Sequence, residues 1–213
     1  MAASSRTLHR VAAGIAVLTA LALALVLVLG RSLRPDARGA HEGPALAIAL
    51  PPFALVSEQN KTFGLADLKG HVWIADFVFT SCTSVCPKLT RRMAEIQQRT
   101  EGLGDALHLV TITVDPENDT PERLAAYAKE AHADPRRWSF LTGSLATIEP
   151  VVIQGFKQAM GRREAPSGLI SIFHGERFVL VDADGMIRGY YEADDAGIEK
   201  LLADATALAR PRA

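Results

Sequence analysis

The sequence predicts an α/β fold, namely a mixed sheet with helices on both faces, preceded by one transmembrane helix. Residues 71–79 and 107–114 are apolar, β-rich runs typical of strands that are buried on both faces. Segments with apolar residues at helical spacing follow both runs, and this alternation builds a sheet covered by helices. The transmembrane helix is expected at residues 11–30, a run without any charged side chain.

Turn and capping signals place the individual elements. Gln59 and Asn60 form a polar turn inside an alternating pattern, and residues 184–185 are an Asp-Gly hairpin turn. Residues 119–122 supply a capping side chain, then proline and glutamate, and so open a helix. Pro150 fits a helix only in its first turn. The predicted elements are a hairpin over 53–65, a strand at 71–79, a helix around 89–96, a strand at 107–114, a helix from 119, a strand at 138–142, a helix at 147–160, a hairpin over 178–191 and a helix from 195.

The uncharged run at 11–30 predicts an uncleaved signal anchor. As a helix it would extend about 30 Å, the thickness of a bilayer core. Because a secretory signal has an apolar region of only about 7–15 residues, and no small-x-small cleavage site follows directly, a cleaved signal, a lipid anchor and a buried core helix are weaker alternatives. We therefore divide the chain into an N-terminal segment (1–10), the anchor, a tether (31–44) and a domain (45–210). Arginines on both sides of the anchor leave its orientation open.

Composition excludes several classes of protein. The chain has 213 residues, of which 48% are hydrophobic and 22% charged, too apolar for a disordered protein. The net charge of −1 gives no basic surface for nucleic acid. With 2 cysteines, the chain has no disulfide framework, so its cysteine chemistry is local. No feature of the sequence suggests a stable oligomer, and we expect a monomer.

The two cysteines, Cys82 and Cys86, lie where a buried strand gives way to a helix. Sites of open α/β sheets lie at the carboxyl ends of strands, and a helix N-terminus favours the thiolate. A spacing of four residues would bring the sulfurs close enough for a disulfide or a shared metal ion. The alternative is structural: two small buried residues or an inert disulfide.

A metal ion on two thiolates needs a further ligand, and histidine is the first candidate. The histidines that follow the anchor are His41 in the tether, His71 at a strand start, His108 within a strand, His132 at a helix end and His174. The last of these is expected on a connecting segment at the start of a strand. A lone loop histidine is more often solvent-exposed than a ligand.

Several motifs, in the right order, resemble the Sco (SCO1/SenC) family, thioredoxin-fold copper proteins of cytochrome c oxidase assembly. Residues 77–87 resemble the family pattern F-T-x-C-x-x-x-C-P, and residues 113–122 resemble D-P-x-x-D-T-P-E. Residues 141–143 are the recurring L-T-G element. His174, eleven residues before Gly185, stands at the place of the family's metal histidine.

The resemblance covers about residues 50–208 and implies a thioredoxin-like fold with a copper site. Carried over by position, Cys82, Cys86 and His174 would be the ligands, and the cysteines would also form a redox-active pair. Two thiolates suit Cu(I), and an imidazole adds affinity for Cu(II). Asp115 would be a nearby acidic residue of unspecified role, or simply a turn former. The family usually has serine or threonine after its histidine, whereas Gly175 follows here.

The resemblance therefore implies a copper metallochaperone that delivers copper to the copper-site subunit of cytochrome c oxidase. The rival is a thiol-disulfide oxidoreductase acting on partner cysteines and served by thiol reductants; a peroxidase-like or purely structural module is a weaker alternative. Thioredoxin-type enzymes have C-x-x-C and a proline facing it, whereas the spacing here is three and the nearest proline before Phe178 is Pro166. These differences favour metal binding. Either role places the domain on the periplasmic side of the inner membrane.

Overall fold

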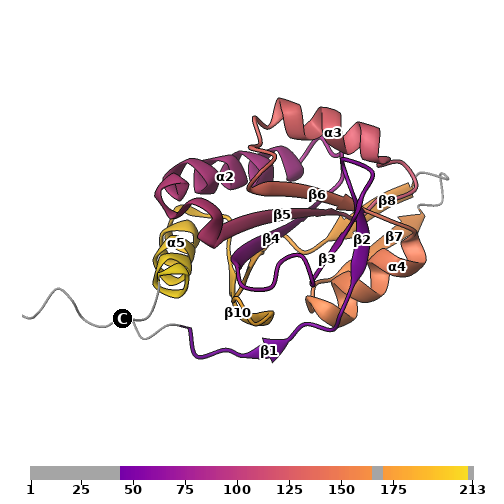
Figure 1. Cartoon of the computed structure of the whole chain (residues 1–213). Coiled ribbons are helices and arrows are strands. Elements are labelled where there is room, and N and C mark those ends of the chain that lie inside the picture. Colours follow the sequence, from indigo (N-terminus) through magenta and orange to yellow (C-terminus); the bar gives the residue numbers. More distant parts are fainter. Residues whose placement is uncertain (1–43, 165–169, 211–213) are drawn as a thin grey trace, which may run out of the picture. The chain divides into compact units, whose positions relative to one another are not determined.

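The computed structural model describes residues 44–164 and 170–210 (Figure 1). The strands are β1 (Ile48–Ala49), β2 (Ala54–Ser57), β3 (Thr62–Gly64), β4 (Val72–Val78), β5 (Leu107–Thr113), β6 (Trp138–Thr142), β7 (Met160–Glu164), β8 (Ile170–His174), β9 (Phe178–Val181) and β10 (Met186–Tyr191). The helices are α2 (Cys86–Arg99), α3 (Pro121–Glu130), α4 (Leu145–Glu149) and α5 (Asp195–Ala209), with a 3₁₀ segment η1 (Glu101–Ala106) and a π-helical segment η2 (Pro150–Gly155).

The predicted mixed sheet is confirmed. It has eight strands in the order β1-β10-β9-β4-β5-β6-β2-β3. The three central strands β4, β5 and β6 are parallel, and every other neighbouring pair is antiparallel. Parallel strands need crossover connections, which α2 and α3 supply. The carboxyl ends of β4 and β5 therefore open on the same edge of the sheet, where the cysteines and residues 115–119 follow.

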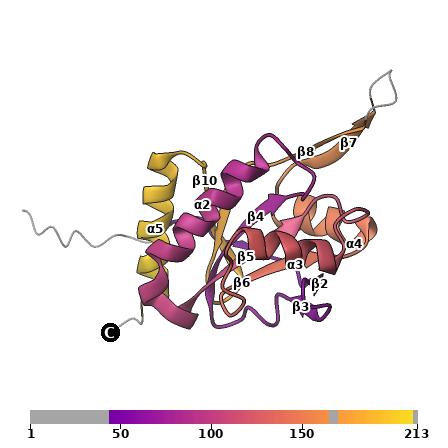
Figure 2. The ribbon, with the colours of Figure 1, turned by 90° about the horizontal axis from the view of Figure 1, so that it is seen from above.

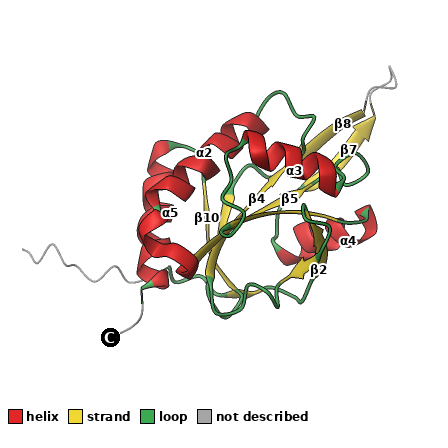
Figure 3. Ribbon diagram, turned by 45° about the horizontal axis from the view of Figure 1, so that its top comes forward, coloured by secondary structure: helices red, strands yellow, loops and turns green. Residues whose placement is uncertain are grey.

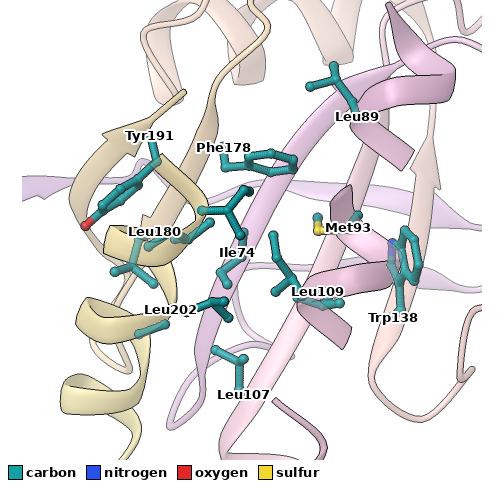
Figure 4. Close-up of a cluster of buried hydrophobic side chains, with 14 of the residues drawn as sticks. Ile74, Leu89, Met93, Leu107, Leu109, Trp138, Phe178, Leu180, Tyr191 and Leu202 are labelled. Atoms are coloured by element: carbon teal, nitrogen blue, oxygen red, sulfur yellow. The ribbon is translucent and has the colours of Figure 1, made fainter. Parts of the chain in front are cut away.

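Both faces of the sheet are covered, as predicted. Alternate residues of β4 face opposite sides: Ile74 belongs to a core with residues of α2, α3 and α5, and Trp73 belongs to a core with residues of α4 and η2. Figure 3 shows α2, α3 and α5 apart from α4 around the sheet. Figure 4 shows the first of these cores, where Met93 of α2 and Leu202 of α5 lie against the sheet. Because both faces are packed, every residue of β4 is buried, which explains its unbroken apolar run.

The helix predicted at 147–160 is wrong at both ends. It begins earlier, at Leu145, where the Ser144 hydroxyl accepts a hydrogen bond from the Thr147 N–H. Pro150 has no N–H to continue the α-helical pattern, and the chain changes there to a π-helical turn, in which the Phe156 N–H donates to the Val151 carbonyl. The chain then leaves the helix, and its last predicted residue begins β7 instead.

Three strands are absent from the sequence prediction. The short strand β1 pairs with β10, and β7 and β8 form a separate antiparallel hairpin (Figure 2). Consequently His174 was misplaced: it is the last residue of β8 and not the start of a strand. The hairpin pairs Met160 with His174 and Arg162 with Ile172, and neither strand joins the eight-stranded sheet.

Within residues 44–164 and 170–210, no helix combines the length and apolar character needed to cross a bilayer. The predicted anchor at 11–30, and nearly all of the tether at 31–44, lie outside the described residues.

Candidate metal centre

Cys82 and Cys86 lie at the carboxyl end of β4, as the sequence predicts, but they are not on one helical turn. Cys82 belongs to the loop between β4 and α2 and is half-buried, whereas Cys86 is the first residue of α2 and is fully buried. The Cys86 N–H donates a hydrogen bond to the Cys82 Sγ over 3.4 Å. A free N–H at a helix start stabilises negative charge, so Cys82 holds the position that favours a thiolate.

The two thiols have opposite pKa shifts. Burial alone would raise the pKa of Cys82, but hydrogen bonds from Cys86 and Ser84 outweigh it and bring the pKa below the ordinary thiol value. Burial raises the pKa of Cys86 far above that value, and its hydrogen bond to Cys82 adds to the rise. Cys82 is thus the accessible, more acidic thiol, and Cys86 is the protected one. Both are free thiols.

His174 comes to the cysteines from the β7–β8 hairpin. Its Nε2 lies 3.5 Å from the Cys86 Sγ, and its Nδ1 lies 2.9 Å from the Gly175 carbonyl oxygen. A proton on Nδ1, donated to that carbonyl, leaves the Nε2 lone pair directed at the cysteine. The imidazole also packs against the Phe79 ring in a T-shaped arrangement, with the centroids 5.9 Å apart. The histidine that the family resemblance implies as a metal ligand therefore lies beside the buried thiol.

These donors fit a soft metal ion. Ligands at about 2.0–2.3 Å from one ion lie about 3.5 Å from each other, the separation of Cys86 and His174. In the described part of the chain no three His, Cys, Asp or Glu side chains already converge on one point, so the three donors would have to shift to surround an ion. A cavity of about 190 Å³ borders Cys82 and His174 and gives an ion access to both.

The other candidate histidines do not reach this site. His71 and His108 contact each other, with ring centroids 4.5 Å apart, at the amino ends of β4 and β5 and thus at the opposite edge of the sheet. His132 lies in a separate groove between α2 and α3, which also borders Cys82. His41 lies outside the described residues.

Asp115 is both a turn former and a site-lining residue. Its main-chain carbonyl accepts hydrogen bonds from the N–H groups of Asn118 and Asp119, which makes the turn. Its side chain is almost fully buried and forms an ion pair with Arg162 of β7, with 2.7 Å between Oδ1 and Nη2. With Cys82 it lines a cavity of about 640 Å³ beside the cysteine loop. Arg162 was not recognised as a site residue from the sequence, because β7 was not predicted.

Two buried carboxylates near the loop were also missed. Asp119 is fully buried and accepts hydrogen bonds from the Thr80 N–H, the Thr80 hydroxyl and the Thr113 hydroxyl. Asp76, in β4, accepts a hydrogen bond from the Thr111 hydroxyl over 2.6 Å, and burial raises its pKa to about 7. A single acidic residue inside an otherwise apolar strand was the available signal for Asp76.

Comparison with known proteins now settles the family. The SCO1/SenC family model matches residues 42–210. The chain belongs to the SCO1/SenC family. A SCO1/SenC family lipoprotein from Bacillus anthracis has a similar structure, with 32% identity and a TM-score of 0.71 over 80% of this chain and 100% of that one.

Two further Sco structures are similar. ScoI from Bradyrhizobium japonicum, solved with copper bound, is 26% identical, with a TM-score of 0.65 over 75% of this chain and 99% of that one. BsSco, described as having a disulfide switch and as a member of the Sco family of cytochrome c oxidase assembly proteins, is 29% identical, with a TM-score of 0.65 over 78% of this chain and 95% of that one. The thioredoxin-like fold implied by the sequence motifs is thereby confirmed.

Proposed function

We propose that this Sco protein is a copper metallochaperone that holds copper on Cys82, Cys86 and His174. The observation that carries the proposal is the 3.5 Å approach of the His174 Nε2 to the Cys86 Sγ, between residues 88 positions apart in the chain. Packing of the hydrophobic core does not require a histidine beside a buried thiol, whereas binding of a shared metal ion requires the two side chains to be adjacent. The copper bound to ScoI of Bradyrhizobium japonicum supports copper as the ion.

The chemistry of the donors suits a carrier. Two thiolates favour Cu(I), the imidazole adds affinity for Cu(II), and oxidation of the cysteines to a disulfide would withdraw both sulfurs. The cavities beside Cys82 leave that sulfur accessible to a partner's ligands. Copper would therefore leave by ligand exchange, in which a partner replaces Cys82 first while Cys86 and His174 still hold the ion.

The partner and location follow from the family and from the N-terminal sequence. The recipient is the copper-site subunit of cytochrome c oxidase, in agreement with the assembly role stated for BsSco. The uncharged run at 11–30 anchors the protein in the inner membrane, and the domain at 45–210 works on the periplasmic side. A reporter fused after Ala213 that is active only in the cytoplasm would contradict this orientation.

Copper stoichiometry tests the proposal directly. The reduced full-length chain, in mild detergent, is expected to bind one copper ion, and the His174→Ala variant is expected to lose most of its Cu(II) affinity. His132→Ala is the matched control, because that histidine borders Cys82 from the α2–α3 groove without contacting Cys86. If the wild-type chain binds no copper, or if both histidine variants bind it equally, the proposed site is wrong.

A second candidate, thiol-disulfide exchange, rests on the unequal thiols. An accessible cysteine with a lowered pKa beside a buried one with a raised pKa is the arrangement of an attacking and a resolving thiol. Alkylation of the reduced protein at neutral pH is expected to modify Cys82 well before Cys86. Rapid exchange with a disulfide partner by a wild-type protein that holds no copper would make this candidate the function.

A further inference from the structure

The hairpin that carries His174 is attached to the rest of the domain at few points. Neither β7 nor β8 belongs to the eight-stranded sheet, and Figure 2 shows the hairpin projecting from the side of the domain. At its base, Met160 is buried in the core and the Gly175 N–H donates to the Ala159 carbonyl over 2.8 Å. Ile172 also packs against this core, but apolar contacts are non-directional, so a directional contact is needed to fix the orientation of the two strands.

Arg162 makes that contact. Its guanidinium pairs with Asp115, over 2.7 Å, and with Glu117, both in the segment that follows β5. Among residues whose side chains the structure describes, no other ion pair joins the hairpin to the rest of the domain. Because Asp115 is almost fully buried and also accepts from the Asn118 amide, its carboxylate is a fixed point that the guanidinium must meet.

Arg162 and His174 lie on the same side of the hairpin. Met160 pairs with His174 and Arg162 pairs with Ile172, and residues two apart on a strand face the same way. Ile172 itself borders the cavities of about 640 Å³ and about 190 Å³ beside Cys82. The ion pair between Arg162 and Asp115 therefore holds the face of the hairpin that carries His174 against the cysteine loop.

We propose that Arg162 is a positioning residue for the metal centre: its ion pairs with Asp115 and Glu117 hold His174 against Cys86. This inference rests on the proposed function, because it assigns a role in the same copper site. Without these ion pairs the hairpin can move away from the cysteine loop. The imidazole of His174 then leaves the metal site, while both thiols remain in place. The Cu(II) form, which depends on the imidazole, is weakened more than the Cu(I) form.

The test compares Arg162→Gln with Arg163→Gln in the full-length protein. Arg163 is the next residue of the same strand, and its replacement by glutamine removes the same charge. Its guanidinium, however, lies over the exposed Phe173 ring, 5.9 Å from the centroid. In the reduced, metal-free protein, amide exchange at Gly175 is expected to be about tenfold faster in Arg162→Gln, as for the loss of a charge-assisted hydrogen bond. Arg163→Gln is expected to exchange at the wild-type rate.

Copper supplies the second measurement. In Arg162→Gln, Cu(II) affinity is expected to fall about tenfold, with a loss of imidazole-nitrogen coupling in the electron paramagnetic resonance signal, while Cu(I) affinity stays close to wild type. Arg162→Lys, which keeps the charge, is expected to recover part of both losses. A merely structural role would lower both copper affinities equally and leave the nitrogen coupling unchanged, and that result would overturn the proposal.

The two measurements separate this inference from the proposed function. If the wild-type chain binds no copper, the proposed function fails, and amide exchange still decides whether Arg162 holds the hairpin. If copper binds but the two arginine variants behave alike, only the role of Arg162 fails. Should Arg162→Gln not fold, because Asp115 is left buried and unpaired, the double variant Asp115→Asn with Arg162→Gln removes that charge and gives the same comparison.

Discussion

Replacement of Asp119 by alanine should destabilise the protein severely, although the residue is polar and lies outside the hydrophobic core. Its carboxylate is fully buried and joins three parts of the chain: the loop that follows β4, the end of β5 and the start of α3. It accepts from the Thr80 N–H over 3.1 Å and from the Thr80 and Thr113 hydroxyls over 2.5 Å each. These are the contacts that fix the first residues of the cysteine loop.

The expected loss follows from the number of donors left without an acceptor. A hydrogen bond to a charged group contributes about 1.5–3 kcal/mol, but bonds that share one acceptor are not additive. The Thr113 hydroxyl also accepts from the Asp115 N–H and keeps that partner after the substitution. We therefore expect the free energy of unfolding to fall by about 3–5 kcal/mol, at the upper end for a single substitution.

Urea unfolding, followed by tryptophan fluorescence, measures this loss. Asp184→Asn is the control, because Asp184 lies exposed in the β9–β10 turn and should change stability by less than about 0.5 kcal/mol. A loss below about 1 kcal/mol for Asp119→Ala, with an unchanged denaturant slope, would show that the three bonds contribute little net energy and would refute the reasoning.

Three further substitutions test other parts of the structure. An ideal Cβ at Gly175 would lie 2.1 Å from the Oε1 of Gln158, which is buried, so Gly175→Ala should displace the end of β8 and lower Cu(II) affinity, and Gln158→Ala in the same chain should restore it. Met93→Ala leaves a cavity at a fully buried position of α2 and should lower the free energy of unfolding by about 2–4 kcal/mol in thermal unfolding, whereas Met93→Leu, which nearly conserves the volume, should lower it by less than about 1.5 kcal/mol. Burial, together with the charge of nearby His71, lowers the pKa of His108 from 6.5, so the folded state resists its protonation. Stability should therefore fall as the pH drops below about 6.5, and His108→Gln should remove that part of the slope, which is at most about 1.4 kcal/mol per pH unit.

Strands and helices whose apolar residues keep a single spacing along the whole element could be predicted from the sequence. The run 71–79 is apolar at every position but two, and such a run has few ways to be buried other than between two layers of helices. The helix at 147–160 failed because Pro150 was assigned to a first turn, while in the structure it marks the change to a π-helical turn. The period of the side chains does not distinguish these alternatives, since both bury Ile148 and Val152.

The metal-site residues were named by motif and spacing, but the means by which they meet were not. Two arginines occupy β7 and its amphipathic signal is weak, so the hairpin escaped prediction, and with it the ion pair of Arg162. The glycine that follows His174 departs from the family pattern, and the structure supplies the reason: the Gln158 side chain fills the space that a larger residue would need. A single sequence does not show such compensation between residues 17 positions apart.

The cysteines and the histidine are held by different contacts that meet in the segment after β5, and this arrangement has a chemical consequence. Asp119 fixes the cysteine loop, whereas Arg162 and Gly175 fix the hairpin that carries His174. A disulfide between Cys82 and Cys86 needs movement of the loop alone, but a three-ligand copper site needs both parts in place. Changes in the hairpin should therefore lower Cu(II) affinity more than they shift the reduction potential of the cysteine pair, because His174 also contacts Cys86, and changes at Asp119 should alter both. Redox titration of the Arg162 and Asp119 variants, with the copper measurements, distinguishes this arrangement from a single rigid site, in which every variant would shift both properties together.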